Sequence, residues 1–201
     1  CVPWRIINGI ELPHETWSGK EITLKAVARN VPVPFDYTWN PGDGSPEVTQ
    51  TATNVAGACS LQLRHTYIAY DNTPFYALVR IVQTNGSVLS DAYPVLVRPK
   101  SLDVEMNVAI DEGLWYLHTN QTRIDLDAAT QGGHWSHGSG QTLNVTASAV
   151  QAFAINGHLL TDDGARDPYV ETVRRGINYL LSKLAYTPIG PQAYGDPDGN
   201  G

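Results

Sequence analysis

One phrase of this sequence occurs twice, and the repeat limits how the second half of the chain can fold. Residues 109–118 read AIDEGLWYLH and residues 172–181 read TVRRGINYLL, 63 positions apart. Over that offset the matching pairs are Ile110 and Val173, Gly113 and Gly176, Leu114 and Ile177, Tyr116 and Tyr179, and Leu117 and Leu180. A repeated helical unit marks an array in which no unit buries its apolar face alone. We therefore predict a stack of helices after a first half of a different kind.

Charge and composition narrow the classes of partner. The chain has 201 residues, a hydrophobic fraction of 42% and a net charge of −7. All of the acidic excess lies in residues 101–201, because residues 1–100 carry 8 basic and 8 acidic side chains. An acidic chain without a run of basic residues argues against a nucleic-acid partner. The charge fits cation binding or plain solubility, and no apolar run is long enough to predict a membrane span.

The two cysteines, Cys1 and Cys59, both lie in the first half of the chain. An even number of cysteines allows a disulfide in an oxidising compartment. Two free thiols are the alternative, and the spacing does not decide between them.

Alternating apolar residues predict β-strands across residues 20–98. Ile22, Leu24 and Ala26 alternate with polar residues, and a second alternating run starts at Phe75. This period of two is typical of strands with one buried face. Proline and glycine turns, including the hairpin pair Asn85-Gly86, separate the runs. Several short strands at this spacing predict a β-sandwich.

Within this region, residues 37–45 (YTWNPGDGS), residues 65–67 (HTY) and the strand after them follow the order of a PKD domain. Residues 15–98 resemble that family, although Pro41 stands where its members usually have an aromatic residue. The resemblance implies an immunoglobulin-like β-sandwich on a surface or secreted protein. The turn residues expected to have structural roles are Trp39, Gly42, Asp43 and Gly44. We expect Trp39 to fill the space between the sheets, and the glycines with Asp43 to form a tight turn.

After a linker over residues 99–103, three helices are predicted. The first covers about 103–119, capped by Ser101 or Asp103, with a buried stripe made of Met106, Ile110, Gly113, Leu114 and Leu117. The second covers about 144–156 and is apolar nearly all round, which predicts burial on every side. The third begins at Pro168, with Asp167 as its cap, and ends before Pro188. Glycines inside helices are unfavourable, so we expect another helix to approach Gly113 and Gly176 closely.

The order of helix, Gly-Trp loop, buried helix and helix is similar to the α/α-toroid repeat of the prenyltransferase and squalene-cyclase superfamily. The residues that carry the resemblance are Gly113–Leu117, Gly133–Trp135 and Thr146–Ala149, and it covers about 105–185. It implies a helical hairpin and part of a toroid, because the chain contains about one and a half units. The uncovered stripe of the third helix then needs the sandwich, further sequence or another molecule against it.

The last residues read GDPDGNG, which matches the opening of a calcium loop. The predicted metal ligands are Asp196, Asp198 and Asn200, with a flexible turn as the alternative. His134 and His137 alone provide too few ligands for zinc. No nucleophile elbow, phosphate-binding loop or superfamily acid motif is present, so we predict no catalytic residue.

Together these patterns predict an α+β multidomain chain, with a β-sandwich over 1–98 and a helical repeat segment over 104–201. We expect a structural or adhesive protein of the extracellular space or cell surface that associates with other subunits, with calcium as its cofactor. Glycans are a second class of partner. Two alternatives remain open: an accessory piece of a toroid enzyme acting on polysaccharide or isoprenoid, and a carbohydrate-binding module using Trp4, Trp17 or Tyr70.

Overall fold

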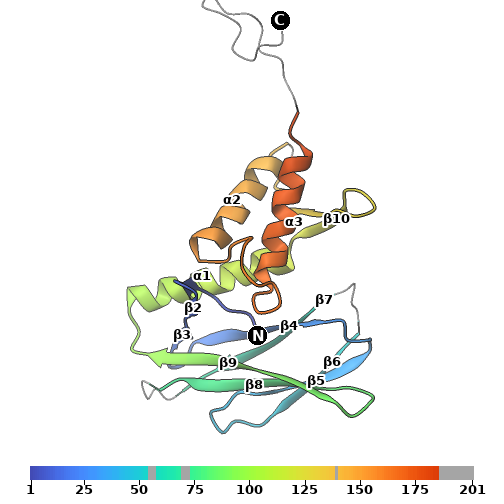
Figure 1. Cartoon of the computed structure of the whole chain (residues 1–201). Helices are drawn as coiled ribbons and strands as arrows, with labels where there is room; N and C mark the ends of the chain where they lie inside the picture. The colour runs from blue at the N-terminus through green and yellow to red at the C-terminus, as the bar shows by residue number, and fades with distance from the viewer. Residues whose placement is uncertain (54–57, 69–72, 139, 186–201) are drawn as a thin grey trace, which may run out of the picture.

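The computed structural model describes residues 1–53, 58–68, 73–138 and 140–185, and it is a mixed α+β structure (Figure 1). The β-strands form a layered region at one end of the molecule, and the three helices lie together against one side of it. The predicted α+β class is confirmed at this level. None of the described helices combines the length and the apolar character needed to cross a bilayer.

Two sheets pack around the first hydrophobic core. A five-stranded sheet has the order β3-β9-β8-β5-β6. Its strands are β3 (His14–Trp17), β9 (Val88–Arg98), β8 (Phe75–Val82), β5 (Phe35–Asn40) and β6 (Val48–Ala52). β3 runs parallel to β9, while the other neighbours in this sheet are antiparallel. The second sheet pairs β4 (Glu21–Arg29) with β7 (Ala58–Thr66).

The alternation in the sequence correctly identifies the apolar side of these strands. Ile22, Leu24 and Ala26 of β4 are buried, as are Ala77, Val79 and Ile81 of β8. One position departs from the alternation, because Lys25 points away from this core and is nevertheless fully buried. The first helix covers it.

The helices occur where the sequence predicts them. They are α1 (Leu102–Thr119), α2 (Thr142–Ile155) and α3 (Tyr169–Ser182). Ser101, rather than Asp103, caps α1 by accepting a hydrogen bond from the Val104 amide. The Asp167 carboxylate accepts one from the Tyr169 amide at 2.9 Å, so it satisfies an otherwise unpaired donor at the start of α3. The predicted Gly-Trp loop also contains a short hairpin, β10 (Thr122–Asp125) and β11 (Gln131–His134).

The predicted faces of the helices need correction. The buried stripe of α1 consists of Val104, Val108, Asp111, Leu114, Trp115 and His118, whereas Met106 and Gly113 are exposed. Only Thr146, Ala149 and Phe153 of α2 are buried, so this helix is not enclosed on every side. The other side of α2 is open to solvent, where Ala147 is exposed and Ile155 is 74% exposed.

The N-terminal segment, residues 1–13, ties the two regions together. It contains the two-residue strands β1 (Ile6–Ile7) and β2 (Ile10–Glu11). Val2 donates its amide to Lys25 of β4, while Ile6 donates its amide to Asn156 after α2. Packing therefore crosses the predicted linker over residues 99–103 in both directions. Val2 belongs to the helical core, and Val104 of α1 belongs to the core between the sheets.

Candidate functional site

The turn after β5 has structural contacts. Trp39 is completely buried between the sheets, and Gly42 and Gly44 adopt φ angles of 81° and 86°. Asp43 accepts hydrogen bonds from the Ser45 amide at 3.0 Å and contacts His65 Nε2 at 2.8 Å. Burial alone would raise the pKa of the Asp43 carboxyl, but the bonds from His65 and Ser45 hold it below its usual value. These contacts fix the backbone of the turn.

A cluster of charged and titratable side chains is buried where α1 crosses β4. Lys25 Nζ lies 2.8 Å from Asp111 Oδ2 and 3.3 Å from Glu112 Oε1. His14 Nδ1 lies 2.9 Å from the same Asp111 oxygen. The Tyr93 hydroxyl is 2.7 Å from His14 Nδ1, and His14 Nε2 is 2.9 Å from the Val2 carbonyl oxygen. We name these residues (His14, Lys25, Tyr93, Asp111 and Glu112) the buried ion cluster.

Burial and ion pairing have opposite effects on the pKa values of His14 and Asp111. Burial lowers the pKa of His14, although the Asp111 charge opposes that shift. Burial alone would raise the pKa of the Asp111 carboxyl, but His14 and Lys25 lower it to about 2. Burial raises the pKa of Tyr93 well above its usual range. Lys25 and Asp111 therefore form an ion pair without direct access to solvent, which suits a structural contact better than proton exchange with a substrate.

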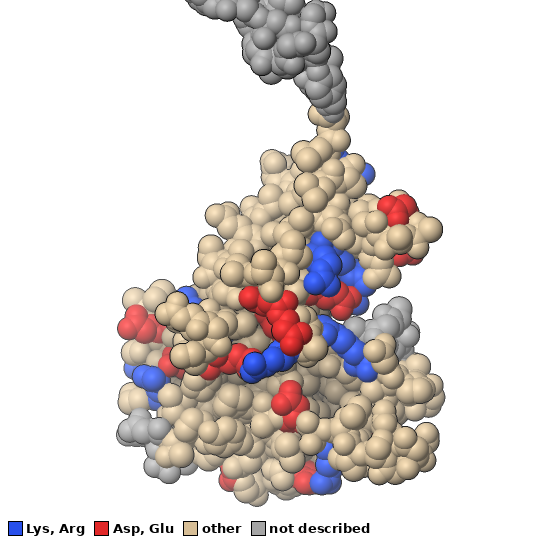
Figure 2. Space-filling view, in the orientation of Figure 1, with Lys and Arg blue, Asp and Glu red and all other residues tan. Residues whose placement is uncertain are grey.

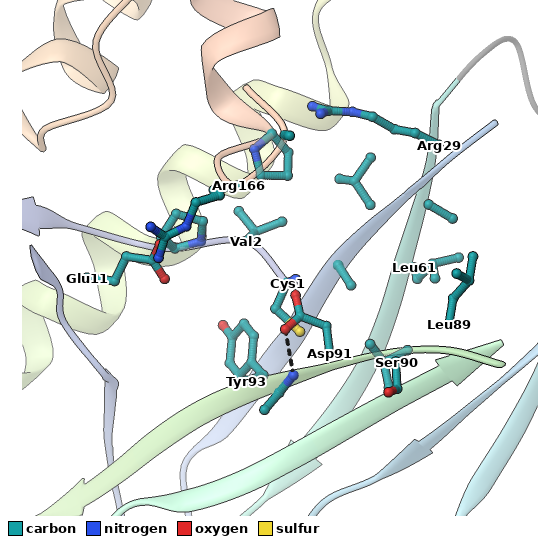
Figure 3. A pocket seen from close by; sticks show the side chains of 18 of the residues that line it. Cys1, Val2, Glu11, Arg29, Leu61, Leu89, Ser90, Asp91, Tyr93 and Arg166 are labelled. Carbon is teal, nitrogen blue, oxygen red and sulfur yellow. Dashed lines mark hydrogen bonds and ion pairs between the residues drawn. The ribbon is translucent and has the colours of Figure 1, made fainter. Parts of the chain in front are cut away.

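A cleft of about 450 Å³ lies beside this cluster, between the sheets, the N-terminal segment and the loop before α3 (Figure 3). Its walls are mainly small and aliphatic residues of the two sheets, such as Ala28, Leu61 and Ile81. The terminal amino group of Cys1 pairs with Asp91 inside it. Both Cys1 and Cys59 are free thiols in the structure, and their disulfide stays a prediction.

A second buried histidine holds the N-terminal segment to the helices. His158 Nδ1 lies 2.8 Å from Asp167 Oδ2, and its Nε2 lies 3.1 Å from the Trp4 carbonyl oxygen. His14 and His158 therefore each connect an aspartate of the helical region with a backbone carbonyl of residues 2–4. Neither role was predicted, because the contacts join positions far apart in the sequence.

A broad polar cleft of about 1040 Å³ opens between β4, the β10–β11 hairpin and α3. Arg29, Arg174 and Arg175 contribute cations to its lining, and Glu171 lies among them. Figure 2 shows basic side chains gathered beside α3 and the hairpin, with acidic side chains next to them. We name this feature the arginine cleft. This cleft could not be predicted from the sequence, because its arginines come from separate segments.

The predicted calcium ligands Asp196, Asp198 and Asn200 lie outside the described residues, as does Tyr70. Within the part of the chain that the structure describes, no three or more His, Cys, Asp or Glu residues are grouped to hold a metal ion. His134 packs its ring against Tyr179, with centroids 4.7 Å apart. Trp4 is buried and donates its ring N–H to the Pro13 carbonyl, so it presents no free indole face for a ligand.

Comparison with known proteins gives no assignment: no family model matches the chain, and no curated protein does.

Proposed function

We propose that this chain is a non-catalytic structural module of the extracellular space or cell surface, which associates with other subunits through the far end of its helices. In this proposal the β-layers are a PKD-like, immunoglobulin-like sandwich and the helices are part of an α/α-toroid. The two packed sheets, the buried Trp39 and the glycine turn support the first assignment. The packed helices and the sequence repeat support the second.

The observation that carries the proposal is a difference between the two copies of the repeat. Leu114, His118 and Gln121 of the first copy are 2%, 3% and 7% exposed. The positions 63 residues later are Ile177, which is half-buried, Leu181, which is 56% exposed, and Leu184, which is 76% exposed. In a stacked array of repeats, equivalent positions are expected to be buried to the same extent by neighbouring elements.

In the first copy, this cover comes from the elements that follow α1 in the chain. Trp135 donates its indole N–H to the Leu117 carbonyl at 2.8 Å. Gln121 donates its amide to the Thr172 carbonyl at 2.8 Å, and His118 Nδ1 lies 2.6 Å from the Thr172 hydroxyl. No described element covers the corresponding part of α3, so its leucines face solvent.

A third leucine joins this surface because α2 and α3 are antiparallel. Gly176 contacts Val150 near the middle of both helices, while the ring of Tyr169 at the start of α3 lies 5.0 Å, centroid to centroid, from that of Phe153 at the end of α2. Leu143 at the start of α2, 45% exposed, therefore lies at the same end as Leu181 and Leu184. We name these three leucines the distal patch. Several exposed leucines at one end of a helix pair are typical of surfaces that another subunit covers.

Sedimentation velocity across a range of protein concentrations tests the proposal. We expect the chain to self-associate, and the variant Leu181→Ser with Leu184→Ser to remain monomeric. Val88→Ser is the matched control, because Val88 is similarly exposed (56%) but lies on β9 in the sheet region. A chain that is monomeric at every concentration, or that still associates after both leucines are replaced, would contradict self-association through the distal patch.

The calcium part of the proposal has its own measurement. If Asp196, Asp198 and Asn200 bind calcium and support the contact, a chelator lowers the association constant and added calcium restores it. The variant Asp196→Asn with Asp198→Asn would then associate equally with and without chelator. Association that is independent of calcium would remove the metal from the proposal and leave the distal patch as its basis.

A further inference from the structure

The arginine cleft has a charge that differs from the rest of the helical region. Residues 101–201 contain 5 basic and 12 acidic side chains, yet three of those five basic residues, Arg123, Arg174 and Arg175, lie at or beside the cleft. Arg29 of β4 adds a fourth guanidinium from the sheet region. Cations from three separate elements are therefore brought together on an otherwise acidic surface.

The Glu171 carboxylate interacts with most of these arginines. Arg175 lies 2.8 Å from Glu171 Oε1 and donates to Gln131 Oε1 at 2.6 Å, while Arg29 lies 3.8 Å from Glu171 Oε2. Burial alone would raise the pKa of Glu171, but Arg175, Arg123 and Arg29 hold it below its usual value. Burial lowers the pKa of Arg123, and the charges of Arg175 and Arg29 act in the same direction. Three guanidinium groups, those of Arg29, Arg123 and Arg175, therefore act on the single carboxylate of Glu171, which does not neutralise them all.

Two of the arginines are available to a ligand. Neither Arg123 nor Arg174 forms an ion pair with any described residue. Arg174 is exposed and lines the cleft, whereas Arg123 lies beside it, with part of its side chain buried and part in contact with solvent. Two acidic residues of the hairpin, Asp125 and Asp127, also line the cleft, and neither forms an ion pair with Arg123 or Arg174. Asp127 turns back on its own loop, where it accepts the amides of Ala129 and Thr130 at 2.8 and 2.7 Å. The unpaired guanidiniums can therefore donate to an incoming carboxylate, which they recognise with two parallel hydrogen bonds.

The remaining lining indicates the class of ligand. Thr130, Gln131 and Asn178 supply a hydroxyl and two amides, and the only apolar side chains are those of Ala128, Ala129 and Ala165. A peptide ligand normally needs apolar or aromatic pockets for its side chains. Amides and hydroxyls next to guanidiniums match a chain of sugars that carries both hydroxyl and carboxylate groups. We propose that the arginine cleft binds an acidic polysaccharide through its carboxylates, independently of the distal patch.

Titration calorimetry with polygalacturonate at low ionic strength tests this site. We expect binding that weakens as salt increases, because the contacts are between charges and partly solvated. Arg174→Gln is expected to weaken binding by about tenfold, the usual effect of losing one charge-assisted hydrogen bond. Arg123→Gln is expected to act in the same direction. Neither side chain forms an ion pair with a described residue, so circular dichroism should show an unchanged fold.

Matched controls separate this site from general attraction. Lys183→Gln removes one positive charge from the end of α3, outside the cleft lining, and should leave the affinity unchanged. Neutral dextran should not bind. The measurements are repeated in the Leu181→Ser, Leu184→Ser background, so that failure of self-association does not affect them.

Three outcomes would overturn the assignment. The first is no binding of polygalacturonate at low salt. The second is an equal loss of affinity in Arg174→Gln and Lys183→Gln, which would indicate non-specific attraction. The third is equally tight binding of polyglutamate with the same dependence on Arg174, which would assign the cleft to acidic protein segments instead.

Discussion

The helices contact the sheets through buried charges, whereas at their far end they present leucines to solvent. At the first surface, Lys25, Asp111 and His14 are brought together from positions far apart in the sequence and are shielded from water. At the second, Leu143, Leu181 and Leu184 are 45%, 56% and 76% exposed. A buried ion pair requires a specific partner at a specific distance, whereas an apolar surface accepts many partners. The first surface fixes one geometry within the chain, and the second is available for association.

The largest expected effect comes from breaking the buried ion cluster. Asp111→Ala leaves Lys25 buried, with only Glu112 nearby at 3.3 Å. We expect the free energy of unfolding to fall by about 3–5 kcal/mol, because an unpaired charge inside a protein is strongly unfavourable. Urea denaturation followed by circular dichroism measures the change. Asp103→Ala, an exposed position in the first turn of α1, should lower it by less than about 1 kcal/mol.

Removing both charges distinguishes the ion pair from a packing effect. Lys25→Met together with Asp111→Ala should be more stable than Asp111→Ala alone, because the double variant buries no unpaired ammonium group. If the double variant loses as much stability as the sum of the single variants, the two side chains are not coupled, and the contrast between the two surfaces would no longer hold.

The next largest expected effect is a loss of stability in acid, which arises at the contact between α1 and α3. Burial, with a smaller contribution from the Arg123 charge, lowers the pKa of His118 from 6.5 to about 3. A histidine with a depressed pKa stabilises the fold while it is neutral. Its contribution is therefore present above about pH 6.5 and is lost as the pH falls towards 3. We expect a loss on the order of 3 kcal/mol over that range, in addition to the effects of other groups.

The variant His118→Gln isolates this contribution. Its free energy of unfolding should decrease less between pH 7 and pH 3 than that of the unmodified chain, since glutamine does not titrate. His137→Gln, which replaces an exposed histidine, is the control and should retain the full dependence on pH. An unchanged pH dependence in His118→Gln would show that this contact is open to water, like the distal patch.

Local periodicity predicted the elements of this fold but not the residues that join them. The period of two in β4 and β8 depends only on neighbouring residues, so the strands and their buried faces could be read from the sequence. The buried stripe of α1 could not, because it includes Asp111 and His118, whose burial depends on partners 97 and 54 residues away. The arginine cleft was missed for the same reason, since its cations come from β4, β10 and α3.

The smallest expected effects compare the two glycines of the repeat. A side chain at position 176 would place its Cβ 2.5 Å from Val150 Cγ2, whereas at position 113 no described atom beyond the neighbouring residues and backbone of α1 itself lies within 4 Å. Gly176→Ala should lower the free energy of unfolding by about 1–3 kcal/mol, because valine is stiff and the contact is overpacked. Gly113→Ala should raise it by about 0.5–1 kcal/mol, the usual gain of alanine over glycine inside a helix. Thermal denaturation of both variants measures the difference.

The expectation from the sequence was close approach at both glycines, and destabilisation in both variants would restore it. Opposite signs would instead show that the glycine position is closely packed in α3 and open in α1, the reverse of the leucine positions of the distal patch, so the two copies of the repeat are covered on different sides.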